Sequence, residues 1–373
     1  NMILRECQIR NSLMQKRQQA EGQPSTKSKK HKRQRHLYLV LDDWDRGYTI
    51  RKIDVDDDDA RQPSPHPQRP PCPTSGLAGT FCSHDLHLIT SLGSHILAAS
   101  NRHPVTLAYD TDTGGLAAGP SLPDALLGAS NIFLPAADAI YAFGYYFTER
   151  PQSVEVMSSS QENPRRLIPS KDWSWRSFAP SPFTIDERIS SYAVHPDGRT
   201  VFVSAFLCTT GSPRRRTFSF NTTGDGDCEW RCHGEWALPF EGQGYFDGDL
   251  VAWVGLDEDG LIGTCQVVSR SGSSSNTTAS AMQEQLGWKM AKDKLWSERQ
   301  QAADGPTLTA MGNARFCLVD CVKGEELHGC TLQITTFRLR YSRRRELEIF
   351  DRNTRSCPVS KRLNTFSPVV FWM

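Results

Sequence analysis

Cysteine and histidine side chains, the usual ligands of zinc, gather in one stretch of this sequence. Cys72, Cys82, His84 and His87 follow one another closely. A structural zinc site needs four converging nitrogen and sulfur ligands, and about two to five residues typically separate the members of each pair, with at least about three between two histidines. Here nine residues separate the cysteines and two separate the histidines. We therefore interpret these side chains as structural and predict no metal site.

Two further cysteine pairs lack the partners that a metal would require. Cys228 and Cys232 lie beside His233, with no second histidine near them. Cys317 and Cys321 lie on a predicted strand, where residues four apart merely share a face. We interpret both pairs as buried structural thiols.

Aspartates in short turns are a second candidate for metal chemistry. The segment Asp110–Gly114 (Asp-Thr-Asp-Thr-Gly) alternates carboxylates as calcium loops do, and similar spacings occur at 225–227 and 257–260. None of these stretches supplies the distal Glu of an EF-hand. Asp and Gly are also the residues that hairpin turns require, so we predict turns rather than calcium sites.

Motifs for catalysis are missing as well. No G-x-S-x-G nucleophile motif occurs, and Gly242–Gly244 lacks the spacing of a dinucleotide-binding loop. A copper site would need several converging imidazoles, whereas the second half of the chain contains only His195, His233 and His328. We predict no catalytic residue, no cofactor and no metal.

The elements that would position any site are short β-rich runs that recur along the chain. In one set, the starts of successive runs lie 59, 44, 61, 50 and 65 residues apart. Each run of this set is followed by a second run of β-branched or alternating residues. The first runs are 37–41, 96–99, 140–143, 201–204, 251–254 and 316–319, and the second runs are 48–53, 105–109, 153–157, 217–220, 264–268 and 335–339. An aromatic third run follows in three units, at 173–178, 230–236 and 288–290.

This recurrence predicts an all-β fold, a kelch-like β-propeller of about six four-stranded blades. Radial stacking covers each sheet with its neighbours, and we expect the outer Trp and Phe side chains to pack between blades. We predict three regions: a disordered basic tail at 1–35, the propeller at 36–350 and a disordered C-terminal tail at 351–373.

Several of these runs resemble a large uncharacterised plant family, abundant in grasses, whose members carry a domain of unknown function. The matching stretches are 35–44, 191–204, 233–240, 244–256, 316–321 and 335–337. The resemblance spans about residues 35–345 and implies a kelch-like or galactose-oxidase-like propeller. It brings no catalytic motif with it, and the segments 1–34 and beyond Arg345 depart from the family's pattern.

Charge and cysteine content bear on location and partners. The chain has 373 residues, 43 Lys and Arg against 42 Asp and Glu, a mean hydropathy of −0.49 and eleven Cys. No secretory leader is visible, so we expect reduced thiols in an intracellular protein, cytoplasmic or nuclear. The tail carries a possible nuclear import signal. Its basic residues are Lys27, Lys29, Lys30, Lys32, Arg33 and Arg35.

These observations favour a non-enzymatic propeller that binds another protein through loops such as 57–82 and 269–285. We expect a monomer that binds neither membrane nor nucleic acid, because the net charge is only +1 and no aromatic residues interleave the basic run. Two alternatives stay open: a small-molecule or carbohydrate site on the propeller axis, with or without enzymatic activity, and a nuclear regulatory protein.

Overall fold

The computed structural model describes most of the chain beyond the N-terminal segment. The described ranges are 35–43, 47–55, 74–77, 88–145, 152–159, 172–178, 180–184, 186–207, 214–222, 230–268, 286–295, 305–323, 330–359 and 368–373. The chain divides into two compact units, Asn1–Arg35 and His36–Met373. The predicted tail and its import signal, apart from Arg35, lie outside the described residues, so the fold concerns the second unit.

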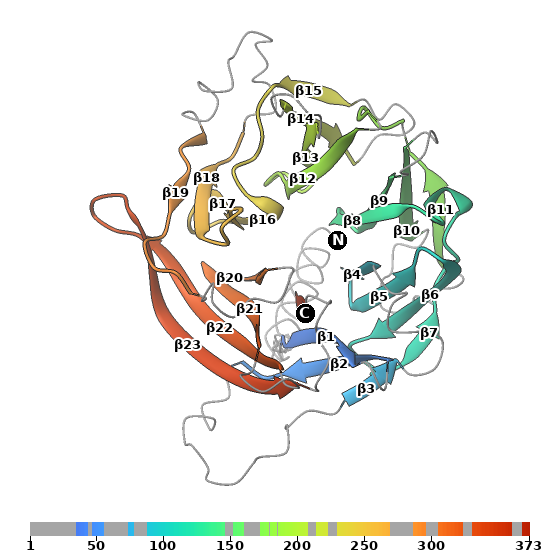
Figure 1. Ribbon diagram of the computed structural model, residues 1–373, viewed down its shortest axis with the longest axis horizontal. Helices are drawn as coiled ribbons and strands as arrows, with labels where there is room; N and C mark the ends of the chain where they lie inside the picture. The colour runs from blue at the N-terminus through green and yellow to red at the C-terminus, as the bar shows by residue number, and fades with distance from the viewer. Residues whose placement is uncertain are drawn as a thin grey trace, which may run out of the picture. The chain divides into compact units, whose positions relative to one another are not determined.

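The second unit is built from β-sheets, in six blades of four strands each (Figure 1). Within each blade, neighbouring strands are antiparallel. From the axis outward, the first blade is β24 (Val369–Trp372), β1 (Leu37–Asp43), β2 (Gly47–Ile53) and β3 (Thr74–Leu77), and the second is β4 (Leu88–Leu92), β5 (His95–Ser100), β6 (His103–Asp110) and β7 (Leu116–Ala118). The third blade is β8 (Ser130–Ala136), β9 (Ala139–Tyr145), β10 (Ser153–Ser159) and β11 (Trp173–Ser177), and the fourth is β12 (Glu187–Val194), β13 (Thr200–Leu207), β14 (Arg214–Asn221) and β15 (Arg231–Gly234). The fifth blade is β16 (Glu241–Asp247), β17 (Ala252–Leu256), β18 (Ile262–Gln266) and β19 (Lys289–Met290), and the sixth is β20 (Thr307–Gly312), β21 (Arg315–Lys323), β22 (Cys330–Tyr341) and β23 (Leu347–Val359). A 3-10 helix, η2 (Asp124–Leu126), precedes the third blade.

The all-β fold predicted from the recurring runs is therefore confirmed. The first set of runs falls on the second strand of each blade, and the second set falls on the third strand. The second strands are covered on both faces; all six residues of β5 are buried, for example. In the described part of the chain, no helix has the length and apolar composition of a membrane span.

The segment 351–373, expected to be a disordered tail, instead contributes to two strands. Asp351–Val359 belongs to β23, and β24 forms the innermost strand of the first blade, where it pairs antiparallel with β1. Backbone hydrogen bonds in both directions between His36 and Met373, 2.7 and 3.0 Å long, extend this pairing. β23 escaped recognition because it is a largely exposed, Arg-containing edge strand. β24 consists entirely of strand-forming residues, Val-Val-Phe-Trp, but is only four residues long, and its partner β1 lies at the other end of the chain.

The fourth and fifth blades share one continuous sheet. Their innermost strands β12 and β16 pair in parallel, with Tyr192 opposite Gln243 and Ala193 opposite Gly244. This pairing fixes the two strands at hydrogen-bonding distance beside the axis.

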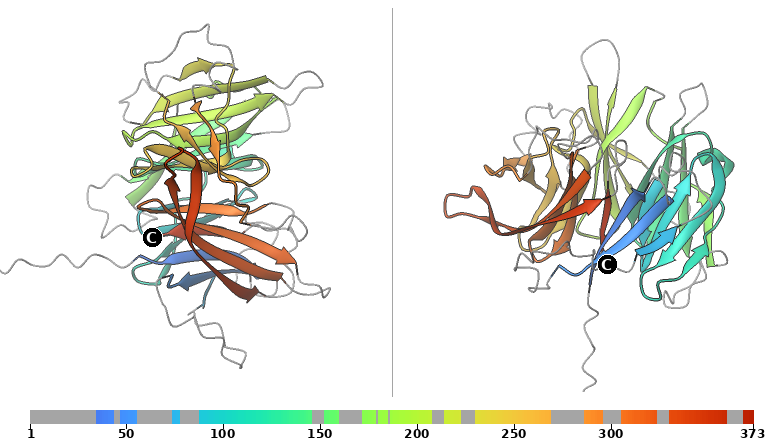
Figure 2. Two further views of the ribbon diagram at one scale, coloured as in Figure 1. Left: turned by 90° about the vertical axis from the view of Figure 1, so that its left-hand side faces the viewer. Right: turned by 60° about the horizontal axis from the view of Figure 1, so that its bottom comes forward.

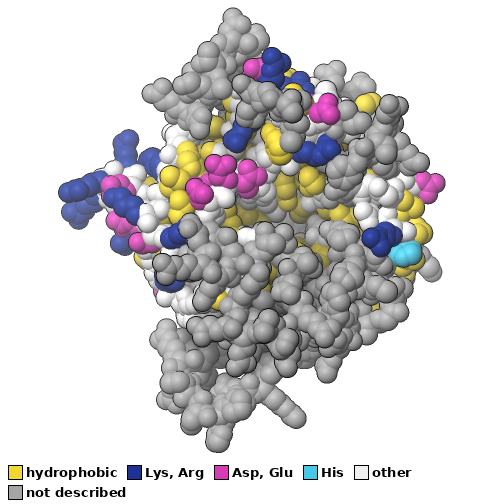
Figure 3. Space-filling view, viewed as in Figure 1, with side chains coloured by type: hydrophobic (Ala, Val, Ile, Leu, Met, Phe, Trp, Pro, Cys, Tyr) yellow, Lys and Arg dark blue, Asp and Glu magenta, His cyan; other side chains and the backbone are white. Residues whose placement is uncertain are grey.

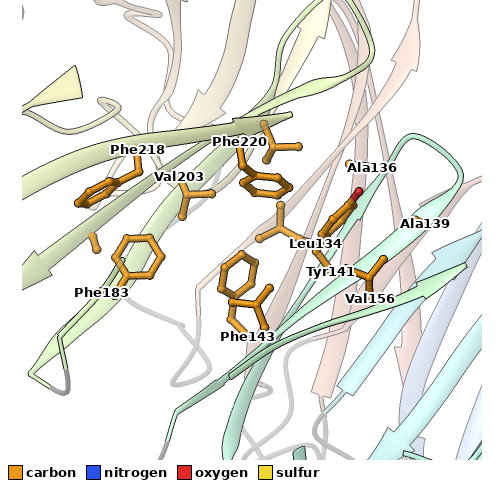
Figure 4. Close-up of a cluster of buried hydrophobic side chains, with 13 residues drawn as sticks. Leu134, Ala136, Ala139, Tyr141, Phe143, Val156, Phe183, Val203, Phe218 and Phe220 are labelled. Carbon is orange, nitrogen blue, oxygen red and sulfur yellow. The ribbon is translucent and has the colours of Figure 1, made fainter. Parts of the chain in front are cut away.

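Hydrophobic clusters lie between successive blades. Between the third and fourth blades, Tyr141 and Phe143 of β9 face Phe220 of β14, with ring centroids 4.9 and 6.5 Å apart (Figure 4). On the outer strand β11, Trp173 is buried among side chains of the second and third blades, such as Leu97. The prediction that outer aromatic residues pack between blades is thus confirmed.

Candidate functional site: the axial cavity

A cavity of about 430 Å³ is formed where the innermost strands of all six blades meet. Its walls come from β4, β8, β12, β16, β20 and β24. Each blade supplies only part of the wall, so the cavity forms only when all six blades are assembled into the ring.

On the β12 and β16 side, the wall carries a hydroxyl–amide pair. The parallel register places Tyr192 beside Gln243, and the Tyr192 hydroxyl donates a hydrogen bond of 3.3 Å to Gln243 Oε1. Burial raises the pKa of Tyr192, so its hydroxyl stays protonated at neutral pH and keeps this donor role. The Gln243 amide nitrogen has no acceptor among the described residues and is available to a ligand.

Side-chain hydrogen bonds also join the next inner strands around the axis. Tyr245 of β16 donates to the Leu308 carbonyl of β20 over 3.1 Å, and Thr307 of β20 donates to the Pro368 carbonyl over 3.0 Å. Burial raises the pKa of Tyr245 to about 12. Because these bonds fix neighbouring strands to each other, this half of the wall is preorganised.

Glu241 is the one acidic side chain among the described residues that line the cavity. It lies at the start of β16, and its side chain reaches solvent. Burial of part of the group raises its pKa and Glu258 adds to this, whereas Arg215 opposes it. Viewed down the axis, acidic side chains gather over β16 and β17 (Figure 3). Glu241 can accept hydrogen bonds, but acid–base catalysis of the kind that glycosidases perform uses two carboxylates.

The remaining wall combines aromatic and aliphatic side chains with Ser and Thr hydroxyl groups of β4 and β20. Phe133 of β8 and Phe371 and Trp372 of β24 line the cavity, together with aliphatic residues of β4 and β20. Aromatic faces beside a few fixed polar groups are typical of sites for small organic ligands.

The Cys and His side chains considered from the sequence as metal ligands divide into those outside the described residues and those within them. Cys72, Cys82, His84, His87 and Cys228 are outside the described residues. Within the described ranges, no group of three or more Cys, His, Asp or Glu side chains could hold a metal ion.

The remaining cysteines and the histidine of these sets lie on two strands of different blades, β15 and β21. The prediction of buried thiols is confirmed for Cys317 and Cys321 on β21 but is wrong for Cys232, which is exposed on β15. His233 is buried, and its Nε2 lies 2.8 Å from the Ser219 hydroxyl.

The two described aspartate turns use their carboxylates within the turn. Asp110 accepts hydrogen bonds from the Asp112 amide and the Thr113 hydroxyl, at 3.0 and 2.8 Å. Asp257 accepts from the amides of Asp259 and Leu261, at 3.0 and 2.7 Å. These carboxylates organise hairpin turns.

The loops proposed for partner recognition are largely outside the described residues. Of 57–82, only Thr74–Leu77 is described, and it forms the outer strand β3; none of 269–285 is described. The cavity residues, in contrast, were not recognised from the sequence. They belong to innermost strands that carry polar side chains toward the axis, and no motif marks them.

Comparison with known protein families matches most of the chain to one family but gives no activity. A family model described as a protein of unknown function, DUF1668, matches residues 34–357. Among solved structures, apo AztD from Citrobacter koseri is similar over 91% of this chain and 98% of that chain, with 10% identity and a TM-score of 0.35. No curated protein matches the chain.

Proposed function

The chain belongs to the DUF1668 family of proteins of unknown function, and we propose that it is a binding protein that holds a small, uncharged polyhydroxy molecule, such as a sugar, in its axial cavity. The observation that carries this proposal is the cavity wall, which combines fixed hydrogen-bonding groups with aromatic faces. A sugar presents hydroxyl groups at its edge and C–H groups on its faces, which matches such a wall.

Size and charge both support this ligand class. The volume of about 430 Å³ falls within the range of roughly 300–1,000 Å³ that is usual for ligand pockets. Among the described lining residues there is no Lys, Arg or His to balance an anion. The amide nitrogen of Gln243 and the carboxylate of Glu241 supply one donor and one acceptor for ligand hydroxyls.

Protein binding, the function favoured by the sequence, is the second candidate. One specific observation supports it: the hairpin of β22 and β23 carries exposed, unbalanced charge at its tip. The two candidates concern different parts of the molecule and do not exclude each other.

The axial proposal is tested by titration calorimetry of the full chain with a panel of common monosaccharides and disaccharides. Gln243→Leu removes the free donor at nearly constant volume, and Tyr192→Phe removes the hydroxyl that orients it. Each change is expected to weaken binding by about tenfold, the effect of losing one well-placed hydrogen bond.

Tyr341→Phe is the matched control, because it removes a hydroxyl that hydrogen-bonds Thr264 in the outer part of the ring. It should leave the affinity unchanged. If no sugar of the panel binds, or if all three variants bind equally, the axial sugar site is wrong.

A further inference from the structure

The hairpin of β22 and β23 differs from the outer strands of every other blade. These strands have 12 and 13 residues, whereas the third and fourth strands of the other five blades have between two and eight. The register pairs Cys330 with Val359 at one end and Tyr341 with Leu347 at the other. As a result, the end of the hairpin extends outward beyond the neighbouring blades (Figures 1 and 2).

The tip of this hairpin is a closed and well-bonded turn. The Ser342 hydroxyl accepts hydrogen bonds from the amides of Arg344 and Glu346, at 3.2 and 3.1 Å. The Ser342 amide donates to the Glu346 carbonyl, and the Arg345 amide donates to the Ser342 carbonyl, each at 2.9 Å.

Within this turn, Arg345 has a φ of +60°, a left-handed conformation that Gly or Asn adopts more easily. Ala137, Asp138, Asn313 and Ala314 adopt positive φ in other hairpin turns of this chain, so the conformation at Arg345 belongs to a tight, closed turn.

Three arginines at this tip carry charge that the hairpin itself does not neutralise. Arg343, Arg344 and Arg345 are exposed, and no carboxylate among the described residues pairs with them. The blue side chains at the left edge of Figure 3 lie at the end of this hairpin.

The acidic residues of the hairpin already have cationic partners. Glu346 pairs with Lys292 at 2.9 Å, Glu348 with Arg340 at 3.1 Å, and Asp351 with Arg338 at 3.6 Å.

We propose that this arginine tip, Arg343 to Arg345, is a docking site for a short acidic segment of a partner protein. Guanidinium groups bind carboxylates through paired, charge-assisted hydrogen bonds, and a rigid turn presents three of them without first having to order a loop. The inference rests on protein binding, the second candidate function, and is independent of the axial ligand.

Nucleic acid fits this surface less well than an acidic peptide. Binding along a phosphate backbone uses an extended basic stripe, whereas the excess positive charge here is concentrated in one turn of a chain whose net charge is +1. Single strands also need free aromatic faces on which bases stack. The two aromatic rings nearest the tip already hold cations: Lys289 lies 5.0 Å from the centre of the Tyr341 ring, and Arg340 lies 4.9 Å from the centre of the Phe350 ring.

The test measures binding of a fluorescent 12-residue peptide of alternating Glu and Asp to the full chain by anisotropy, at low salt. The tip variant carries Arg343→Gln, Arg344→Gln and Arg345→Gln. A matched control carries the same charge change at three exposed arginines of other blades, Arg176→Gln, Arg199→Gln and Arg214→Gln. A double-stranded oligonucleotide of equal charge is the second probe.

We expect the peptide to bind the native chain and the control variant with equal affinity, and the tip variant at least about tenfold more weakly, with an affinity that falls as salt rises. Equal binding by the tip and control variants, or no binding to the native chain, overturns the proposal. Tighter binding of the oligonucleotide, lost in the tip variant, overturns the choice of a protein partner. Thermal unfolding of both variants confirms that each is folded, and axial ligand binding should be the same in both.

Discussion

The aromatic ring of Phe240 lies directly against the backbone of Gly255, so that a Cβ atom on this glycine would be 2.6 Å from Cγ of the ring. The same ring covers Gly244 on the neighbouring strand β16. Phe240 is 2% exposed and belongs to the cluster between the fourth and fifth blades. The two glycines therefore make room for a ring that fills the space behind the cavity wall.

Replacing Gly255 with Ala should destabilise the protein by about 1–3 kcal/mol, because the added methyl group forces Phe240 or the strand to move. Urea unfolding measures this change in stability as a shift of the unfolding midpoint, with the m value the same in both proteins. Gly248→Ala is the control, since a Cβ there meets nothing within 4 Å. Equal midpoints for the two variants would show that the ring has room to shift.

The Glu187–Arg216 pair should contribute more to stability than the ion pairs of the surface. Arg216 donates to both carboxylate oxygens of Glu187, at 2.7 and 2.6 Å, and the Thr184 amide adds a third bond of 2.7 Å. Burial alone would raise the pKa of Glu187, but these hydrogen bonds outweigh it and the pKa is lowered.

We expect Glu187→Gln to lower the free energy of unfolding by about 2 kcal/mol. Glu348→Gln breaks the exposed pair with Arg340 and should change it by less than about 1 kcal/mol. Side-chain exposures of 4% for Glu187 and 41% for Glu348 underlie the difference. The reverse order of the two effects in urea unfolding would contradict this prediction.

His233 should make the protein less stable in mild acid. Burial lowers its pKa to about 4, with a smaller effect of Arg231, and its Nδ1 has no hydrogen-bond partner among the described residues. The unfolded chain binds this proton near the ordinary pKa of about 6.5, so between 6.5 and 4 the unfolded state carries more protons. The free energy of unfolding should therefore fall as pH decreases, by about 2 kcal/mol at pH 5 from this residue.

The measurement compares urea unfolding at pH 7.5 and pH 5 for the native chain, His233→Gln and Ser219→Ala. His233→Gln should lose about 2 kcal/mol less between the two pH values than the native chain does. Ser219→Ala removes only the hydrogen bond to the ring and should keep the native pH dependence. An unchanged pH dependence in His233→Gln would show that the ring is protonated in the folded state.

The cysteines of the described strands should differ sharply in reactivity. Cys232 is exposed, whereas burial raises the pKa of Cys265 and raises that of Cys317 to about 12. Because the thiolate is the reactive form, iodoacetamide should modify Cys232 in the folded protein and the two buried cysteines only in urea. Peptide mapping by mass spectrometry measures this order, and early labelling of Cys317 would reveal local opening of β21.

The sequence indicates the blades better than the cavity, for a physical reason. The second strand of each blade is covered on both faces by neighbouring blades, so it forms an apolar run that can be read locally; β13 has six buried residues in succession. In contrast, the innermost strand β16 lines the cavity with part of its residues. Exposed and buried positions are mixed along it, so it forms no such apolar run.

The candidate site depends on contacts between residues far apart in the chain. The Tyr192–Gln243 bond spans 51 residues and follows from a parallel pairing of two different blades. No local pattern encodes that pairing. The residues between Tyr192 and Gln243 form the rest of the fourth blade, and only this blade brings the two strands together. The same holds for Thr307 and Pro368, which meet only when the last strand closes the ring.

The position of β24 in the chain sets the order of events on the ribosome. Its partner β1 is made first, and roughly 330 residues separate the two strands. At a synthesis rate of about 5–20 residues per second, β1 leaves the exit tunnel on the order of 15–65 seconds before the strand that pairs with it. During this interval, a strand with five buried residues, Leu37 to Leu41, has an open edge in the nascent chain. The edge of β1 therefore stays without its native partner until β24 is made.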